Sequence, residues 1–123
     1  MNLVDSSGWI EYFRDGANAD FFAPPIEDAD NLIVSSINIY EVFKKFLHEK
    51  DENDALKAVS AMRRARVIPV DDRIALEGAR LSREMGLPMA DCLILTTARL
   101  HGAILWTQDA DFKSIEGVRY IRK

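Results

Sequence analysis

Four acidic residues spread along the chain could together hold a divalent cation and activate a water molecule. Asp5 directly follows the first apolar run, Asp91 lies where a later helix is expected to begin, and Asp109 and Asp111 follow the apolar run that ends at Thr107. Carboxylate oxygens are the ligands that Mg²⁺ and Mn²⁺ prefer, and a bound cation lowers the pKa of its water. Carboxylates gathered at one crevice destabilise a fold unless cations or protons neutralise them, so such a group usually has a function.

Each of these acids also has an ordinary structural explanation. Asp5 and Asp91 could cap helices, a role in which Asp is favoured and which contributes about 1 kcal/mol. Asp109 and Asp111 could be turn residues. Taken singly, each acid is explained more simply by structure than by catalysis, and only their grouping at one place favours a functional site.

A fifth acid, Glu41, is not identified by its pattern. On a helical wheel it lies opposite Val42 and Phe46, which belong to the apolar face of a helix expected over residues 39–48. Lys45 follows Glu41 by four residues, which is the spacing of a helical ion pair. Periodicity alone therefore predicts an exposed salt bridge between Glu41 and Lys45.

Short apolar runs alternate with amphipathic segments, which predicts an α/β fold with a mostly parallel sheet of four or five strands and helices on both faces. In such sheets the functional crevice lies beyond the carboxyl ends of the strands, where Asp5 and Asp109 fall. Strands are expected over residues 1–4, 32–34, 67–70 and 103–107, with a last one around 120–121. Helices are expected over residues 6 to about 16, 39–48, 54–65, 71 or 72 to 86, and 90–101. Gly16 and Gly86 mark the ends of the first and fourth of these helices, and residues 35, 36 and 38 offer caps for the second. Pro24 and Pro25 are expected in a loop.

The chain has 123 residues, enough for one domain with its own core over residues 1–123. A cytoplasmic location is expected, because no apolar run approaches the roughly 20 residues of a membrane span and residues 1–5 do not resemble a signal peptide. The single cysteine, Cys92, is expected in the core of a protein from a reducing compartment. The net charge of -4 argues against a protein that coats nucleic acid, but Arg63, Arg64 and Arg66 could assist a metal in contacting phosphate.

Four motifs in this order resemble the PIN-domain ribonucleases, and in particular the short VapC toxins of bacterial and archaeal toxin-antitoxin pairs. Each motif is weak alone, but the combination covers nearly the whole chain and is specific. The motifs are Val4-Asp5-Ser6-Ser7, the segment from Ser35-Ser36 to Glu41, Ala90-Asp91-Cys92-Leu93, and Thr107-Gln108-Asp109-Ala110-Asp111-Phe112.

The resemblance implies a three-layer PIN-like fold and a metal-dependent endoribonuclease that leaves 5′-phosphate and 3′-hydroxyl ends. It also implies a homodimer and a cognate VapB-type antitoxin, whose C-terminal segment would pack in a groove formed by residues 9–13 and 40–47. The cofactor would be Mg²⁺ or Mn²⁺, since the chain offers Zn²⁺ only one Cys and two separated His residues. By this resemblance the catalytic and metal-binding acids are Asp5, Glu41, Asp91 and Asp109, with Asp111 as a further metal ligand and Ser6 and Thr107 orienting the cluster.

Other functions are compatible with parts of the pattern. A phosphoacceptor receiver domain has a similar length and an acidic pocket, but Asp5 has no acidic neighbour and no suitable late Lys follows. A PIN-like module without catalysis, or an RNA-processing PIN nuclease without an antitoxin, also fits the fold. A metal-free route through the RNA 2′-hydroxyl would need paired His residues, and Cys92 as a nucleophile has no base nearby in the sequence.

Overall fold

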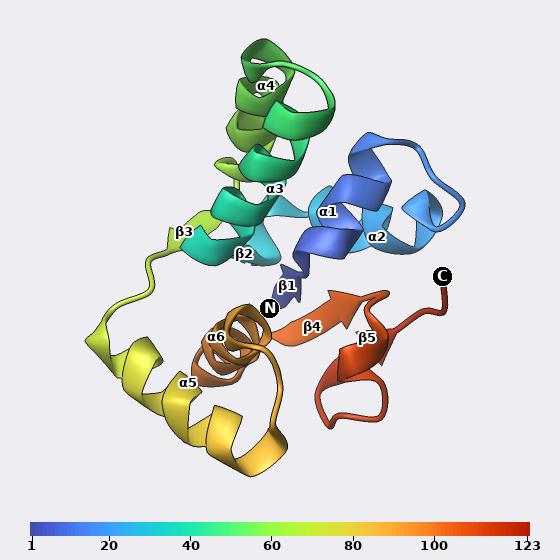
Figure 1. Cartoon of the computed structure of the whole chain (residues 1–123). Coiled ribbons are helices and arrows are strands. Elements are labelled where there is room, and N and C mark those ends of the chain that lie inside the picture. The colour runs from blue at the N-terminus through green and yellow to red at the C-terminus, as the bar shows by residue number, and fades with distance from the viewer.

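Five short apolar segments form one parallel sheet at the centre of the molecule (Figure 1). The computed structural model describes all 123 residues, and the strands lie in the order β3-β2-β1-β4-β5. Every neighbouring pair is parallel, which confirms the expected α/β class. The strands are β1 (Asn2–Val4), β2 (Leu32–Ser35), β3 (Arg66–Ile68), β4 (Ile104–Thr107) and β5 (Val118–Tyr120).

Helices cover both faces of the sheet because successive residues of each strand point to opposite sides. On β1, Val4 packs with the core residues of the first four helices, and Leu3 packs with those of the last two. None of the helices is long and apolar enough to cross a membrane. The helices are α1 (Ser6–Phe13), α2 (Ala19–Ile26), α3 (Ser36–Glu49), α4 (Glu52–Met62), α5 (Asp72–Met85) and α6 (Met89–Leu100), with short 3₁₀ turns η1 (Ala29–Asn31) and η2 (Ala110–Phe112).

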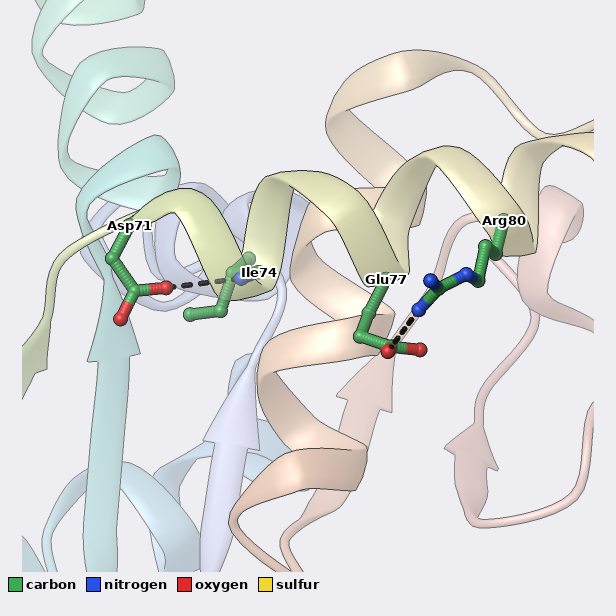
Figure 2. Close-up of polar contacts among 4 residues, drawn as sticks. All are labelled: Asp71, Ile74, Glu77 and Arg80. Atoms are coloured by element: carbon green, nitrogen blue, oxygen red, sulfur yellow. Dashed lines mark hydrogen bonds and ion pairs between the residues drawn. The ribbon is translucent and has the colours of Figure 1, made fainter.

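Side-chain caps fix where α3, α4 and α5 begin. Ser35 caps α3 in a reciprocal arrangement, because its hydroxyl accepts a hydrogen bond from the Ile37 amide while its own amide donates to the Asn38 side chain. Figure 2 shows the start of α5, where Asp71 accepts a hydrogen bond of 2.9 Å from the Ile74 amide. The expected end of α5 at a left-handed Gly86 is also confirmed. These signals lie within a few residues of each other in the sequence, so they could be recognised there.

Further along α5, the same view shows Arg80 paired with Glu77 at 2.5 Å (Figure 2). Both side chains are largely exposed, so this pair contributes little to stability. It faces solvent and has no part in the site described below.

Two expectations for the first third of the chain are wrong. Pro24 and Pro25 lie inside α2 rather than in a loop, because Phe22 and Pro25 are buried and their packing outweighs the missing proline amides. Helix α1 ends at Phe13 rather than at Gly16, and it is Asp15 that adopts the left-handed conformation, with φ 52°.

Candidate active site

A polar cleft with a volume of about 400 Å³ opens beyond the carboxyl ends of β1 and β4. The acids expected from the four motifs, Asp5, Glu41, Asp91 and Asp109, all line this cleft, while Asp111 stands beside it. Only one lining residue is apolar, so the cleft is suited to charged ligands. The lining residues are Asp5, Ser6, Ser7, Ile10, Glu11, Arg14, Glu41, Lys45, Asp91, Gln108, Asp109 and Lys123.

Sheet register brings Asp5 and Thr107 together. Val4 is paired with Trp106, so Asp5, the residue after β1, lies beside Thr107, the last residue of β4. Asp5 precedes α1 but its side chain makes no capping hydrogen bond. Instead its Oδ2 accepts hydrogen bonds from the hydroxyls of Ser7 at 2.8 Å and Thr107 at 2.9 Å. The capping explanation of this side chain is therefore wrong.

Burial raises the pKa of Asp5 to about 6, even though the hydroxyls of Ser7 and Thr107 act in the opposite direction. The carboxylate of Glu41 raises this pKa further by repulsion. Asp5 is thus a carboxylate that burial destabilises in its charged form, and a cation beside it would remove that destabilisation.

Glu41 does not form the salt bridge that its helical spacing predicts. Lys45 pairs with Glu49 at 3.0 Å instead. Glu41 Oε1 accepts a hydrogen bond of 2.7 Å from Ser6, whose hydroxyl in turn accepts one of 2.9 Å from the buried Asn38 side chain. Packing of α1 against α3 therefore directs Glu41 into the cleft, as the family resemblance implied and periodicity did not.

Asp91, Asp109 and Asp111 form the tightest group of acids in the structure. One carboxylate oxygen from each lies within 4.8 Å of the other two. Asp91 is the third residue of α6, where the helix dipole favours a negative charge, and the N-cap position belongs to Pro88. Asp109 also makes a turn, since its Oδ1 accepts a hydrogen bond from the Asp111 amide at 2.9 Å. The turn explanation of Asp109 is thus confirmed, and it leaves the second carboxylate oxygen for another partner.

The pKa of Asp91 is raised to about 7, first by partial burial and then by repulsion from Asp109, Asp5 and Asp111. The contact with the Asp111 side chain raises the pKa of Asp91 further. Four acids that repel each other around one opening are a donor set of oxygen atoms alone, which fits a hard divalent cation such as Mg²⁺ or Mn²⁺. Thr107 supports this arrangement, because its hydroxyl also accepts a hydrogen bond of 2.9 Å from the Asp109 amide.

The basic residues at the cleft are not those proposed from the sequence. Arg63, Arg64 and Arg66 do not line it, whereas Lys45, Arg14 and Lys123 do. The helical spacing could have identified two of these, because Lys45 follows Glu41 by four residues and Arg14 follows Ser7 by seven. Glu11 and Gln108 also line the cleft and were not predicted there, because Gln108 contacts Asn18, which is 90 residues away, and Glu11 contacts the same loop residue, which helical periodicity does not place.

Other candidate groups are structural. Cys92 is buried, and desolvation raises the pKa of its thiol, which makes it a poor nucleophile. His48 lies in the last turn of α3, and His101 follows α6 with its Nδ1 2.9 Å from the Thr97 carbonyl oxygen. Neither His lines the cleft.

Comparison with known proteins places the fold in a known family. Residues 3–118 match the family model described as the PIN domain. The VapC ribonuclease Mb1587 of Mycobacterium bovis is 29% identical over an alignment that covers 94% of this chain and 91% of the relative. Ribonuclease VapC11 of Mycobacterium tuberculosis has the same identity and coverage.

Solved structures share the fold. A toxin-antitoxin complex from Klebsiella pneumoniae contains a chain that is 28% identical, with a TM-score of 0.75 and coverage of 97% of this chain and 96% of the other. VapC20 of Mycobacterium tuberculosis, described as a toxin that cleaves the sarcin-ricin loop, has a TM-score of 0.76 at 17% identity, covering 94% and 95%. The second likeness, at such low identity, shows the fold alone.

Proposed function

The chain belongs to the PIN domain family, and on that premise we propose that it is a metal-dependent endoribonuclease and the toxin of a toxin-antitoxin pair. The proposed unit is a single PIN domain over residues 1–123. The observation that carries the proposal is the convergence of Asp5, Glu41, Asp91 and Asp109, from four separate parts of the chain, on one polar cleft. The curated relatives are VapC ribonucleases, which supports RNA as the substrate.

The proposed metal ligands are Asp5, Glu41, Asp91, Asp109 and Asp111. The raised pKa values of Asp5 and Asp91 support this assignment, because each reflects the burial of a carboxylate and, after that, repulsion from neighbouring carboxylates, both of which a cation would offset. A bound Mg²⁺ or Mn²⁺ would lower the pKa of a water molecule and stabilise the charge that develops on the phosphate and leaving oxygen.

The residues around the acids would keep their geometry fixed during the reaction. Thr107 and Ser7 hold Asp5 through hydroxyl donors, and Ser6 holds Glu41. These contacts occupy Asp5 Oδ2 and Glu41 Oε1, so each carboxylate keeps a second oxygen for a ligand. Preorganised groups of this kind contribute to rate because little rearrangement is needed when charge develops.

The proposed antitoxin site is the groove expected from residues 9–13 on α1 and 40–47 on α3. Trp9, Tyr12 and Phe13 of α1 line a mainly apolar cavity of about 230 Å³, although no residue of 40–47 lines it. On α3, Tyr40 and Leu47 are also exposed, as a protein-binding surface requires.

A homodimer is proposed as well. The exposed Met89 and Leu76 lie on α6 and α5, and a largely apolar cavity of about 420 Å³ opens between these helices. An exposed apolar face of this kind favours association with a second copy. Light scattering over a range of protein concentrations would detect the dimer, and a constant monomer mass would contradict it.

The nuclease proposal is tested by incubating the purified protein with total cellular RNA and Mg²⁺ or Mn²⁺. We expect discrete cuts that leave 5′-phosphate ends, and no cuts in excess EDTA or by the Asp5→Asn and Asp91→Asn variants. The matched control is Asp30→Asn, an exposed acid of η1 that should cleave like the wild type. Undiminished cleavage in EDTA would contradict the metal dependence.

Absence of cleavage with every metal would favour a noncatalytic PIN module. The toxin assignment has its own test, which is co-purification with the protein encoded beside this gene. A Phe13→Glu change, placed in the aromatic cavity, should reduce that binding. Metal-dependent cleavage without such a partner would instead favour an RNA-processing PIN nuclease.

A further inference from the structure

One loop residue, Asn18, connects two cleft residues that the metal-dependent chemistry does not use. The backbone N–H of Asn18 donates to Glu11 Oε2 at 2.9 Å, and the Asn18 side-chain amide donates to Gln108 Oε1 at 2.9 Å. Gln108 is buried and follows Thr107 directly, so it is held next to the proposed metal ligands. The network therefore joins α1, the loop after it and the end of β4.

Gly16 makes room for this network. A side chain there would collide with Glu11, because a Cβ atom built on Gly16 would lie 2.3 Å from Glu11 Oε1. The Gly16 amide also donates to the Glu11 carbonyl oxygen at 3.0 Å, which closes the loop over the end of α1. Glu11 thus fixes the loop that carries Asn18 by accepting hydrogen bonds from the backbone amides of Gly16 and Asn18.

The same Asn18 side chain holds the segment after β5. Its Nδ2 donates to the Arg122 carbonyl oxygen at 3.1 Å. One residue earlier, the Ile121 amide donates to the Thr107 carbonyl oxygen at 3.0 Å. Two hydrogen bonds on consecutive residues therefore direct the segment to the cleft, where Lys123 forms part of the lining.

Lys123 differs from the other two cations at the cleft. Arg14 and Lys45 both pair with the carboxylate of Glu49, and the Arg14 pair connects the end of α1 with α3. Lys123 makes no ion pair in the structure, although it stands at an opening rich in carboxylates. Its ammonium group is therefore available to an anionic ligand that enters the cleft.

We propose that Lys123 binds a backbone phosphate of the polynucleotide substrate and that Asn18 is the positioning residue that holds it there. The inference rests on the proposed nuclease function, and it adds a cationic contact on the side of the cleft formed by β4 and the segment after β5. A lysine meets phosphate as a point charge, so the contact should strengthen substrate binding without selecting a base.

The test uses steady-state cleavage of a fluorescent single-stranded oligoribonucleotide at several salt concentrations. We expect Lys123→Gln to raise KM by roughly three- to tenfold with kcat within about twofold of wild type, since a phosphate contact is uniform binding. The dependence of log KM on log salt should fall by about 0.7, the value for one phosphate of a single strand. Lys123→Arg should retain the wild-type KM, and the matched control Lys113→Gln, an exposed lysine outside the cleft, should change neither constant.

Asn18→Ala should raise KM as much as Lys123→Gln does, and the double variant should be no worse than either single one. A lower kcat or an additive rise in KM in the double variant would show that Asn18 supports the fold instead. If Asn18→Ala does not fold, the Gln and Arg variants of Lys123 still decide the phosphate contact.

The inference and the function on which it rests fail in different ways. Wild-type cleavage with equal KM values for Lys123→Gln and Lys113→Gln would overturn the phosphate contact alone. Absence of cleavage by the wild type would overturn the nuclease proposal and the contact together.

Discussion

Replacing Asp91 by Asn should stabilise the metal-free protein at neutral pH. Folding raises the pKa of Asp91 from 3.8 to about 7, so the folded state binds more protons than the unfolded state between these values. The stability contributed by this group is therefore fully present below pH 3.8 and is lost as the pH rises to about 7. Asparagine has no charge to lose, so the variant should gain most above pH 7.

The size of the gain follows from the shift. A difference of about 3 pKa units corresponds to about 4 kcal/mol at 1.36 kcal/mol per unit. Asp91 is only half-buried, and solvent screens its interactions with Asp109, Asp5 and Asp111, so we expect about 1–2 kcal/mol. For a domain of this size such a gain raises Tm by roughly 3–10 °C.

The assay is thermal unfolding followed by circular dichroism in EDTA at pH 7.5 and pH 4.5. The variant should melt higher than the wild type at pH 7.5, and the difference should shrink at pH 4.5, where the wild-type Asp91 keeps its proton. Adding Mn²⁺ at ten times its Kd should stabilise the wild type by about 1.4 kcal/mol and the variant by less. The control Asp30→Asn should change Tm at neither pH.

The reasoning would be refuted by an Asp91→Asn protein that is less stable than the wild type in EDTA at pH 7.5. A gain of equal size at both pH values would also refute it, because the gain would then have no connection with ionisation. The first result would mean that Asp91 is already neutralised in the folded chain.

Three further predictions concern the same cleft. Mn²⁺ affinity measured by calorimetry should fall at least tenfold between pH 8 and pH 5.5, because protons compete with the cation at Asp5 and Asp91. The pKa values of these two acids are raised to about 6 and about 7. An affinity independent of pH would contradict their assignment as metal ligands. Thr107→Val should lower kcat at least tenfold and cost about 1–3 kcal/mol in urea unfolding, since it removes the donor to Asp5 and leaves the Asp109 amide unpaired. Thr97→Val, which removes a buried hydroxyl that donates only to the Leu93 carbonyl oxygen, is the matched control and should keep full activity. Asp109→Asn should retain the turn and the stability while losing activity, whereas Asp109→Ala should lose activity and also about 1 kcal/mol, and equal stability of the two would contradict a role in the turn.

The convergence of Asp5, Asp91 and Asp109 could be predicted because it depends on the direction of strands and helices. The apolar runs predict a parallel sheet, and in a parallel sheet the residues that follow the carboxyl ends of the strands lie at the same edge. Glu41 could not be placed in this way. Its pattern describes only its own helix, whereas its partner Ser6 lies 35 residues away on α1. The family motif supplied the information that helical periodicity lacks.

The side-chain hydrogen bonds of Asn18 could not be predicted from the sequence either, because their partners lie even farther away along the chain. Its side chain bonds to Gln108 and to the Arg122 carbonyl oxygen, which are 90 and 104 residues away. Asparagine in a loop is ordinary, and no local signal distinguishes one that joins distant segments. Such contacts depend on how the helices and strands pack together, and local patterns in a single sequence do not predict that packing.

The structural and functional explanations of an acid are compatible because a carboxylate has two oxygens. Asp109 uses Oδ1 to accept from the Asp111 amide, and Asp5 uses Oδ2 to accept from Ser7 and Thr107. In each case the structural contact fixes the direction of the other oxygen, which is what a metal site requires of its ligands. A carboxylate that serves a turn is therefore better suited to hold a cation than one that rotates freely. It follows that the turn at Asp109 is evidence for the site rather than against it.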